Sequence, residues 1–195
     1  MNNKKITIRL LVEGKTEENY LKRFKDKHLG NDFIFDIVNM KCGNYSNFIT
    51  QVEQHRGTEI PVFVIADLDR ATDASELKYL RKLCNSIRHV NKYSNIFLTF
   101  EKFETFLSAH FEKYINICQK LKIDNCDLKN DKNIYDAIIR NDGSYENTKI
   151  HLSKNNICYL KDSFSFPKLD EDKINLKQSG LIYFKSYCEL LRTRK

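Results

Sequence analysis

Residues 6–17 read ITIRLLVEGKTE, a run of β-branched and leucine residues that ends in a glutamate and a glycine. Residues 61–69 read PVFVIADLD, a second apolar run that ends in two aspartates. Parallel strands deliver their carboxyl ends to one edge of a sheet, and open α/β folds bind ligands at that edge. The two stretches therefore predict that Glu13, Asp67 and Asp69 lie together at one rim of a parallel sheet.

The apolar pattern predicts strands and helices that alternate through residue 100, as in a mostly parallel α/β sheet. We expect strands over about 5–12, 32–40, 61–66 and 95–100, and helices over about 17–28, 45–55 and 72–88. Thr16 is the expected cap of the first helix. The third strand is apolar throughout, which is typical of a central strand buried on both faces. A strand order of 2-1-3-4 would place Glu13 opposite the two aspartates.

The second half of the chain has a more irregular, helical pattern. We expect helices over about 103–121, 133–139 and 145–155, an amphipathic helix over 181–190, and a polar loop over 161–175. No Gly-, Ser- or Pro-rich tract suggests a flexible linker. We therefore expect an α/β core of residues 1–115 and a mainly helical extension of residues 116–195, packed together as one structural domain.

Composition limits the kinds of partner. Lys and Arg outnumber Asp and Glu by 33 to 26, for a net charge of +7. This excess favours a polyanionic partner, although it also fits a merely soluble basic surface. The six cysteines form no C-x-x-C pair, so a zinc site is not expected. With no secretory leader and no apolar run long enough to cross a membrane, we expect reduced thiols and a cytoplasmic protein.

The three acids predict a magnesium or manganese site. Mg²⁺ prefers oxygen ligands and is usually bound through one or two carboxylates together with phosphate oxygens of the substrate. Without a cation, three clustered carboxylates would repel one another. The alternative is that Glu13 and Asp69 are solvated acids and that Asp67 caps the following helix. The position of both acidic signals directly after predicted strands favours the metal site.

These motifs resemble the Toprim domain of topoisomerases, primases and nucleases, and more narrowly the RloB-like Toprim proteins. The RloB-like proteins begin with a motif like E-G-x-x-T-E-x-x-Y. Residues 13–20, EGKTEENY, offer Glu13, Gly14, Thr16, Glu17 and Tyr20 in that order, with one residue rather than two between Gly14 and Thr16. A second motif, F-E-x-W-L-x-x-H-F, is matched by residues 103–111, FETFLSAHF, with Phe106 in place of tryptophan. Residues 100–102, Phe-Glu-Lys, depart from the Ser-Asn-Pro that often precedes this motif.

The resemblance implies a Toprim-like, Rossmann-like sheet of four mostly parallel strands flanked by helices, with a helical C-terminal extension. It also implies a metal-dependent nuclease that acts on DNA or RNA, with tRNA among the possible substrates, in a bacterial phage-defence system. Glu13 would act as general acid or base and as a ligand, and Asp67 and Asp69 would bind Mg²⁺ or Mn²⁺. An ATPase encoded nearby and a homo-oligomer are possible partners.

Four further residues are candidate supporting residues of this site. Glu17 either supports the acids or stabilises the start of its helix. Lys15 either contacts a phosphate or is an ordinary loop charge. Glu104 and His110 belong to the second motif, and the ordinary reading of His110 is a half-buried residue among aromatic neighbours.

Two other functions remain open at this point. The run DLDRAT at residues 67–72 is similar to the D-x-D-x-[TV] motif of haloacid-dehalogenase phosphatases, in which Asp67 would be the nucleophile. That motif normally follows the first strand. The other alternative is a nucleic-acid-binding or sensing protein that keeps the Toprim fold without catalysis.

Overall fold

The computed structural model describes residues 5–41, 43–152 and 179–193. The strands are β1 (Ile6–Val12), β2 (Phe33–Asn39), β3 (Val62–Asp67) and β4 (Asn95–Thr99). The first helices are α1 (Lys15–His28), α2 (Tyr45–Glu53), α3 (Ala74–Arg88) and α4 (Phe103–Ser108). They are followed by α5 (Ile117–Leu121), α6 (Asn125–Asn130), α7 (Ile134–Arg140), α8 (Tyr145–Leu152) and α9 (Phe184–Thr193). Short 3₁₀ helices are η1 (Gly30–Asp32), η2 (Asp69–Thr72) and η4 (Gly180–Tyr183).

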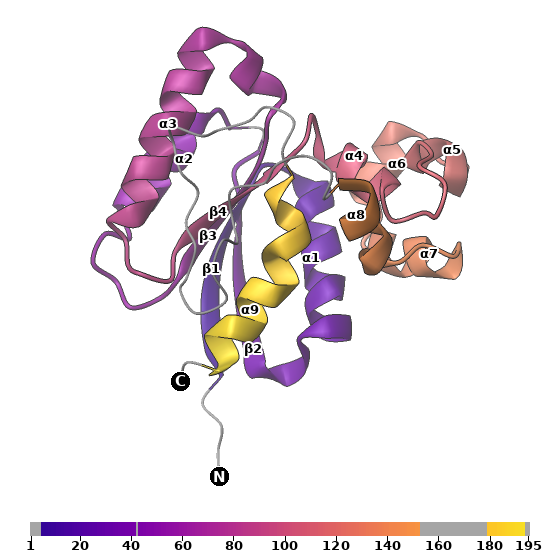
Figure 1. The fold of residues 1–195 in the computed structure, drawn as a ribbon, viewed down its shortest axis with the longest axis horizontal. Coiled ribbons are helices and arrows are strands. Elements are labelled where there is room, and N and C mark those ends of the chain that lie inside the picture. Colours follow the sequence, from indigo (N-terminus) through magenta and orange to yellow (C-terminus); the bar gives the residue numbers. More distant parts are fainter. Residues whose placement is uncertain (1–4, 42, 153–178, 194–195) are drawn as a thin grey trace.

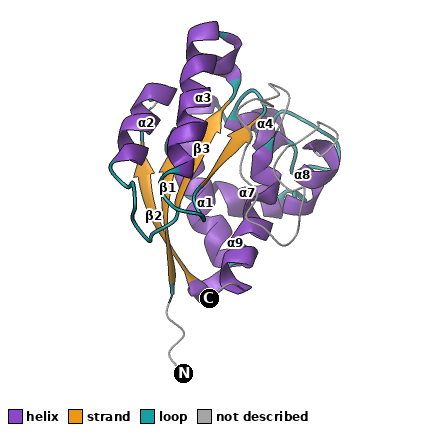
Figure 2. Cartoon of the chain, turned by 60° about the vertical axis from the view of Figure 1, so that its left-hand side comes forward, coloured by secondary structure: helices purple, strands orange, loops and turns teal. Residues whose placement is uncertain are grey.

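The four strands form one parallel sheet in the order β2-β1-β3-β4 (Figure 2). This confirms the predicted fold class, and the order is the one that would place Glu13 opposite the aspartates. The chain moves outward from β1 to β2 and then crosses to β3 on the other side of β1. The edge between β1 and β3 is therefore the switch point, and the carboxyl ends of both strands point to it.

Helices cover both faces of the sheet (Figure 1). Successive side chains of a strand point to opposite faces, so β3 contributes to two hydrophobic clusters. Phe63 and Ile65 pack in the cluster that includes α1 and α9, whereas Val62 and Val64 pack against α2 and α3. This double burial explains why the β3 sequence is apolar throughout.

The start of α1 differs from the prediction. Thr16 is not the cap: Gly14 occupies the N-cap position in an extended conformation, and Thr16 is a buried residue within the first turn. The Glu17 carboxylate instead accepts hydrogen bonds from the backbone N–H groups of Gly14 and of Glu17 itself. This is the glutamate half of a capping box, so an acidic side chain replaces a hydroxyl at the start of this helix.

The predicted long helix over 103–121 is wrong, because it is interrupted after Ser108. The Ser108 hydroxyl donates to the carbonyl of Glu104 at 2.8 Å and accepts the N–H of Ile117 at 3.0 Å. The Asn116 side chain then caps α5. Side chains that bond to nearby backbone groups compete with helix continuation, which explains the break. Helix α6, capped by Asp124, was not predicted.

The last helix was predicted over 181–190 and is found as η4 followed by α9, which ends at Thr193. Helix α8 ends at Leu152 within the described residues, and the predicted loop over 161–175 lies outside them. Residues of α7 and α9 share one hydrophobic cluster with β1 and α1. The division into a core and an extension near residue 115 stays a prediction.

The described cysteines are free thiols. Cys84 and Cys188 are buried, Cys118 is half-buried and Cys126 is exposed. Across the described ranges, no helix has both the length and the apolar character needed to cross a bilayer.

Phe184 joins the C-terminal helix to the sheet. Its ring, 1% exposed, lies 5.3 Å from Phe97, 5.8 Å from Phe35 and 6.0 Å from Phe63 between centroids. We predict that Phe184→Ala lowers the free energy of unfolding by about 3–5 kcal/mol, because the lost ring leaves a cavity. Urea unfolding followed by circular dichroism measures this. Ile150→Ala, at a position 63% exposed, is the control and should change stability by less than about 0.5 kcal/mol; equal losses in both variants would contradict the assignment.

Candidate functional site

Glu13 and Asp67 meet where β1 and β3 end. The two strands pair in parallel with Val12 opposite Ile65, so the register places Glu13 opposite Ala66, one residue before the end of β3. The backbone N–H of Asp67 donates to Oε2 of Glu13 at 3.3 Å. The structure therefore brings together the two acidic motifs that the sequence places fifty-four residues apart.

Asp67 is held from the neighbouring elements. Thr99, opposite Asp67 in the β3–β4 register, donates its hydroxyl hydrogen to Oδ1 of Asp67. The Tyr45 hydroxyl, from the start of α2, donates to the backbone carbonyl of Asp67. These bonds orient both the side chain and the main chain at the end of β3.

Asp69 begins η2, and the end of β4 positions it. Its backbone N–H donates to the carbonyl of Glu101 at 2.9 Å. Glu101 has a φ of 56°, in the left-handed region that non-glycine residues rarely occupy. Such a conformation costs of order 1–3 kcal/mol and persists where the surrounding structure requires it. Oδ1 of Asp69 is buried and has no hydrogen-bond partner among the described residues.

The carboxylates raise one another's pKa values. Burial raises the pKa of Asp67 well above its usual value, and the nearby charges of Glu13 and Glu17 add to the shift. Burial also raises the pKa of Glu13, with smaller contributions from Asp69 and Glu104. For Glu17, burial and the neighbouring acids raise the pKa to about 7. Burial and neighbouring negative charges both disfavour the ionised carboxylates, so ionisation of this cluster is energetically unfavourable.

Arg70 partly offsets that repulsion. Its Nη2 lies 3.4 Å from Oε1 of Glu13, with the two side chains 37% and 13% exposed. The Arg70 charge lowers the pKa of Glu13, against the larger effect of burial. A guanidinium is thus the cation that Glu13 contacts in this arrangement.

The donor set fits a hard divalent cation. Glu13, Asp67 and Asp69 supply only carboxylate oxygens, and the buried Oδ1 of Asp69 lacks a hydrogen-bond donor. In the described part of the chain, no three His, Cys, Asp or Glu side chains already surround one metal position. A bound cation would offset the repulsion among these carboxylates and would allow the three side chains to move closer together.

Of the supporting residues, Glu104 lies within electrostatic reach of the cluster, and the role of Lys15 stays a prediction. Glu104 lies on α4 and its charge raises the pKa of Glu13, Glu17 and Asp67. Lys15 is exposed at the start of α1. Glu17 is 5% exposed and combines both suggested roles, because it caps α1 and lies within electrostatic reach of Glu13.

His110 lies away from the carboxylates, inside the aromatic core. It is fully buried, and its Nδ1 lies 3.0 Å from the Phe106 carbonyl, which can only accept a hydrogen bond. Nδ1 therefore carries the proton, and Nε2 accepts the Tyr20 hydroxyl at 2.8 Å. His110 links the end of α4 to α1, which is the ordinary reading of a histidine among aromatic residues.

The sequence does not predict several residues that lie at the site. Thr99 and Tyr45 contact Asp67, Arg70 pairs with Glu13, and Glu76 in the first turn of α3 has a buried Oε2 without a hydrogen-bond partner in the described structure. Only Thr99 carried a usable signal, because it ends the strand next to β3. The other contacts depend on how α2, η2 and α3 pack.

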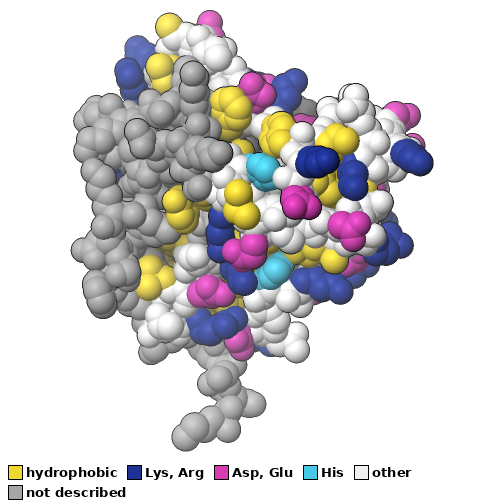
Figure 3. All heavy atoms as spheres, turned by 45° about the vertical axis from the view of Figure 1, so that its right-hand side comes forward, with side chains coloured by type: hydrophobic (Ala, Val, Ile, Leu, Met, Phe, Trp, Pro, Cys, Tyr) yellow, Lys and Arg dark blue, Asp and Glu magenta, His cyan; other side chains and the backbone are white. Residues whose placement is uncertain are grey.

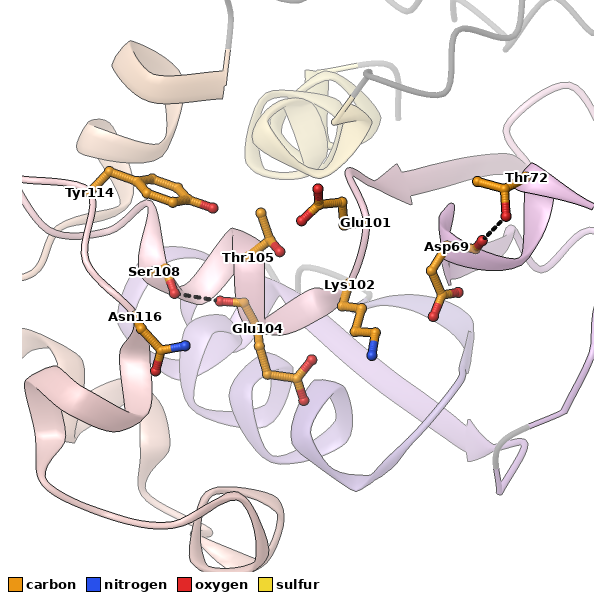
Figure 4. Close-up of a pocket in the computed structure, with 9 residues that line it drawn as sticks. All are labelled: Asp69, Thr72, Glu101, Lys102, Glu104, Thr105, Ser108, Tyr114 and Asn116. Carbon is orange, nitrogen blue, oxygen red and sulfur yellow. Dashed lines mark hydrogen bonds between the residues drawn. The ribbon is translucent and has the colours of Figure 1, made fainter.

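A cleft of about 570 Å³ opens beside the carboxylates (Figure 4). Asp69 and Thr72 lie at one end of it, and Tyr114 and Asn116 lie at the other. Glu104 lies between the two ends. Glu104, which adds its charge to the acidic cluster, therefore also lines a space large enough for a small ligand.

Residues 9–69 match the family model of the Toprim domain of proteins like the overcoming lysogenization defect protein. The matched segment begins inside β1 and ends on Asp69, so it contains both acidic motifs in the parallel sheet described above. This segment is similar to a Toprim domain, and the parallel sheet flanked by helices fits a Toprim-like fold. Toprim domains act in nucleic-acid metabolism and generally bind divalent metal ions. The family matched is a close relative of the RloB-like group, and the narrower RloB-like assignment stays a prediction.

Neither the curated proteins nor the solved structures contain a significant match to this chain. The roles of individual residues in this Toprim-like segment therefore rest on its own geometry.

The surface beside the Toprim-like segment carries mixed charge. On the side of the molecule that α5–α8 occupy, the Lys and Arg side chains of the described residues are interspersed with Asp and Glu (Figure 3). The net charge of +7 is thus not concentrated in one basic patch on this face. Net charge alone does not locate a nucleic-acid interface in this protein.

We predict that Arg70→Gln tightens the binding of Mn²⁺ to the protein by about 5-fold, the effect of a partly exposed ion pair worth about 1 kcal/mol. The Arg70 guanidinium lies against Glu13, so its positive charge opposes the approach of a cation to the acidic cluster. Calorimetric titration of the purified protein measures the affinity. Arg56→Gln, which breaks the pair with Glu53 on α2, is the control and should have no effect. Unchanged or weaker binding in Arg70→Gln would contradict this electrostatic effect.

A second prediction concerns stability and pH. Burial lowers the pKa of His110 from 6.5 to about 4, so the unfolded chain takes up this proton first as the pH falls. Stability from this group is complete above pH 6.5 and declines toward pH 4, by up to about 3 kcal/mol. His110→Gln keeps polar atoms at this position and cannot titrate, so the stability difference between wild type and variant should shrink over this range. Urea unfolding between pH 7 and pH 4.5 measures it, with His89→Gln at an exposed position as the control; a constant difference would contradict the assignment.

Proposed function

We propose that this protein is a divalent-metal-dependent nuclease that hydrolyses phosphodiester bonds in DNA or RNA, with tRNA among its candidate substrates. The observation that carries the proposal is the contact between Glu13 and Asp67 at the β1–β3 switch point of the segment that matches the Toprim model, with Asp69 within electrostatic reach of Glu13. Buried like charges are costly, and a protein retains them where they perform chemistry. The Toprim match supports a nucleic-acid substrate.

In this proposal Asp67 and Asp69 hold the cation, and Glu13 completes the ligand set. Mg²⁺ or Mn²⁺, when bound, would neutralise charge that develops on the scissile phosphate. Thr99 and Tyr45 keep Asp67 in place through its side chain and main chain. The Glu101 carbonyl does the same for the main chain of Asp69.

Glu13 is also the proposed proton carrier. Its Oε2 accepts the Asp67 N–H, which leaves Oε1, the atom nearest to Arg70, to take or return a proton. General acid–base catalysis of this kind contributes typically 10²–10⁴-fold to a rate. Glu17 and Glu104 support Glu13 by keeping the local potential negative, which favours its protonated form.

We also propose that the nuclease works in the cytoplasm in defence against phage, as the resemblance to RloB-like proteins implies. An ATPase encoded nearby and self-association belong to the same proposal. The match to a Toprim family named for a lysogenization defect supports a setting that involves phage.

The two alternative functions give different roles to Glu13. In a phosphatase of the haloacid-dehalogenase type, Asp67 would follow the first strand, but here it ends β3 and Glu13 follows β1. That reading leaves the contact between Glu13 and Asp67 unexplained. A non-catalytic nucleic-acid-binding protein would share the geometry and differ only in turnover.

Glu13→Gln and Asp67→Asn should each lower phosphodiester cleavage by about 100-fold or more, because each removes a charge from the proposed reaction centre while keeping the side-chain shape. Purified protein is incubated with plasmid, single-stranded DNA and tRNA in Mg²⁺, Mn²⁺ or EDTA, and products are separated on gels. Asp26→Asn, on the exposed surface of α1, is the matched control and should cleave as wild type does.

A second readout separates a catalytic role from a structural one. If the carboxylates serve chemistry at the expense of stability, Asp67→Asn should raise the thermal unfolding midpoint of the metal-free protein, since it relieves repulsion. Cleavage that persists in both variants would refute the roles of Glu13 and Asp67. Tight binding of nucleic acid without cleavage by wild type in any metal would favour the non-catalytic alternative.

A further inference from the structure

We propose that the cleft beside the carboxylates binds one unpaired nucleoside of the nucleic acid, with its base stacked on Tyr114. The proposal rests on the proposed function in one respect, because it takes the neighbouring phosphate to lie at Asp67 and Asp69. It adds that the protein recognises single-stranded or flipped-out nucleotides and that Tyr114 determines this preference.

The position and size of the cleft are the first support. Its volume of about 570 Å³ lies within the range of about 300–1,000 Å³ typical of sites for small molecules the size of a nucleotide. Asp69 forms one end, so a group bound in the cleft is continuous with the acidic cluster (Figure 4). A nucleic-acid chain with its phosphate at Asp69 would therefore have an adjacent sugar and base at the mouth of this space.

The charges of the lining decide which part of a nucleotide enters. Three carboxylates, on Asp69, Glu101 and Glu104, line the cleft together with a single lysine, Lys102. Phosphate groups are repelled by such a wall, especially where water is partly excluded. A neutral sugar and base are not repelled. Carboxylate oxygens accept hydrogen bonds from amino groups on base edges and from sugar hydroxyls.

Tyr114 supplies the stacking surface. Its ring is 53% exposed at the end of the cleft opposite Asp69 (Figure 4). A hydrogen bond with the Thr105 side chain of α4 restrains the hydroxyl, and the His151 ring of α8 lies 6.1 Å from the Tyr114 ring in a T-shaped arrangement. The ring is therefore held in place while just over half of the side chain stays exposed. Exposed aromatic rings beside a reaction centre are typical stacking platforms for unpaired bases.

The requirement for an unpaired base follows from the geometry. Inside a duplex each base is stacked and paired, and its edge cannot enter a lateral cleft beside the backbone. Unstacking a base is costly in a duplex and costs little in a single strand. The cleft should therefore favour single strands, loops and flipped nucleotides over continuous duplex.

The test measures binding without cleavage. Fluorescein-labelled single strands of about twelve nucleotides, as DNA and as RNA, and the corresponding blunt duplexes are titrated with protein that carries Asp67→Asn, and anisotropy is recorded. Tyr114→Ala, Tyr114→Phe and Tyr79→Ala are added to this background. Tyr79 is 42% exposed on α3, outside the cleft, and serves as the matched control.

We expect the single strands to bind more tightly than the duplexes. Tyr114→Ala should weaken single-strand binding by about 10-fold or more, whereas Tyr114→Phe, which keeps the ring, should stay within about 2-fold. Tyr79→Ala should have no effect. Equal binding of single strand and duplex, or equal affinity in Tyr114→Ala and Tyr79→Ala, would overturn the proposal, and so would an equal loss in Tyr114→Phe and Tyr114→Ala.

The failure of this inference and the failure of the proposed function give different results. If wild type cleaves no substrate in Mg²⁺ or Mn²⁺ but Tyr114-dependent single-strand binding is found, the cleft is a nucleoside site in a non-catalytic protein. If wild type cleaves duplex and single strand equally and Tyr114→Ala cleaves as wild type does, the nuclease stands and the cleft proposal fails.

Discussion

The repulsion among buried carboxylates at one sheet edge is the constraint on which the site depends. Asp67 and Glu13 are brought within hydrogen-bonding distance by the parallel pairing of β1 and β3, and neither can ionise freely there. A protein selected for stability alone would place neutral side chains at this edge. Among the described residues, the ion pair of Arg70 with Glu13 offsets part of this electrostatic repulsion.

The surrounding elements fix the main chain of these acidic residues more than their carboxylates. Tyr45 bonds the carbonyl of Asp67, and the left-handed turn at Glu101 presents a carbonyl to the N–H of Asp69. The side-chain oxygen Oδ1 of Asp69 is left without a donor in the described structure. Rigid backbone combined with an unsatisfied acidic oxygen is the arrangement that a cation-binding edge needs.

The same negative charge shapes what a polyanionic substrate can do. A phosphate approaches Asp67 and Asp69 favourably only together with a cation, and the acidic lining next to Asp69 keeps further phosphates out of the cleft. In the proposed complex, the substrate backbone would stay at the sheet edge and a neutral part of the nucleotide would face Tyr114. In this proposal, the negative charge of the site affects where the substrate backbone lies as well as the reaction itself.

Local periodicity predicted the strands, because alternation and apolar runs are properties of neighbouring residues. The order 2-1-3-4, considered as a condition, then aligns the strand ends so that Glu13 meets Asp67. The sequence pattern fails where local hydrogen bonds compete with it. It predicts Thr16 as a helix cap, although Gly14 occupies that position, and it predicts one continuous helix where Ser108 interrupts the chain. His110 belongs to a motif, yet its two hydrogen bonds place it in the core.

The sequence by itself therefore determined the sheet and the pair of acidic strand ends. Only the tertiary structure decided which side chains surround them, since Arg70, Tyr114 and Glu104 reach the site through the packing of separate elements. The physical reason is range: hydrophobic periodicity acts over a few residues, whereas burial, charge repulsion and the shape of a cleft depend on contacts between segments distant along the chain.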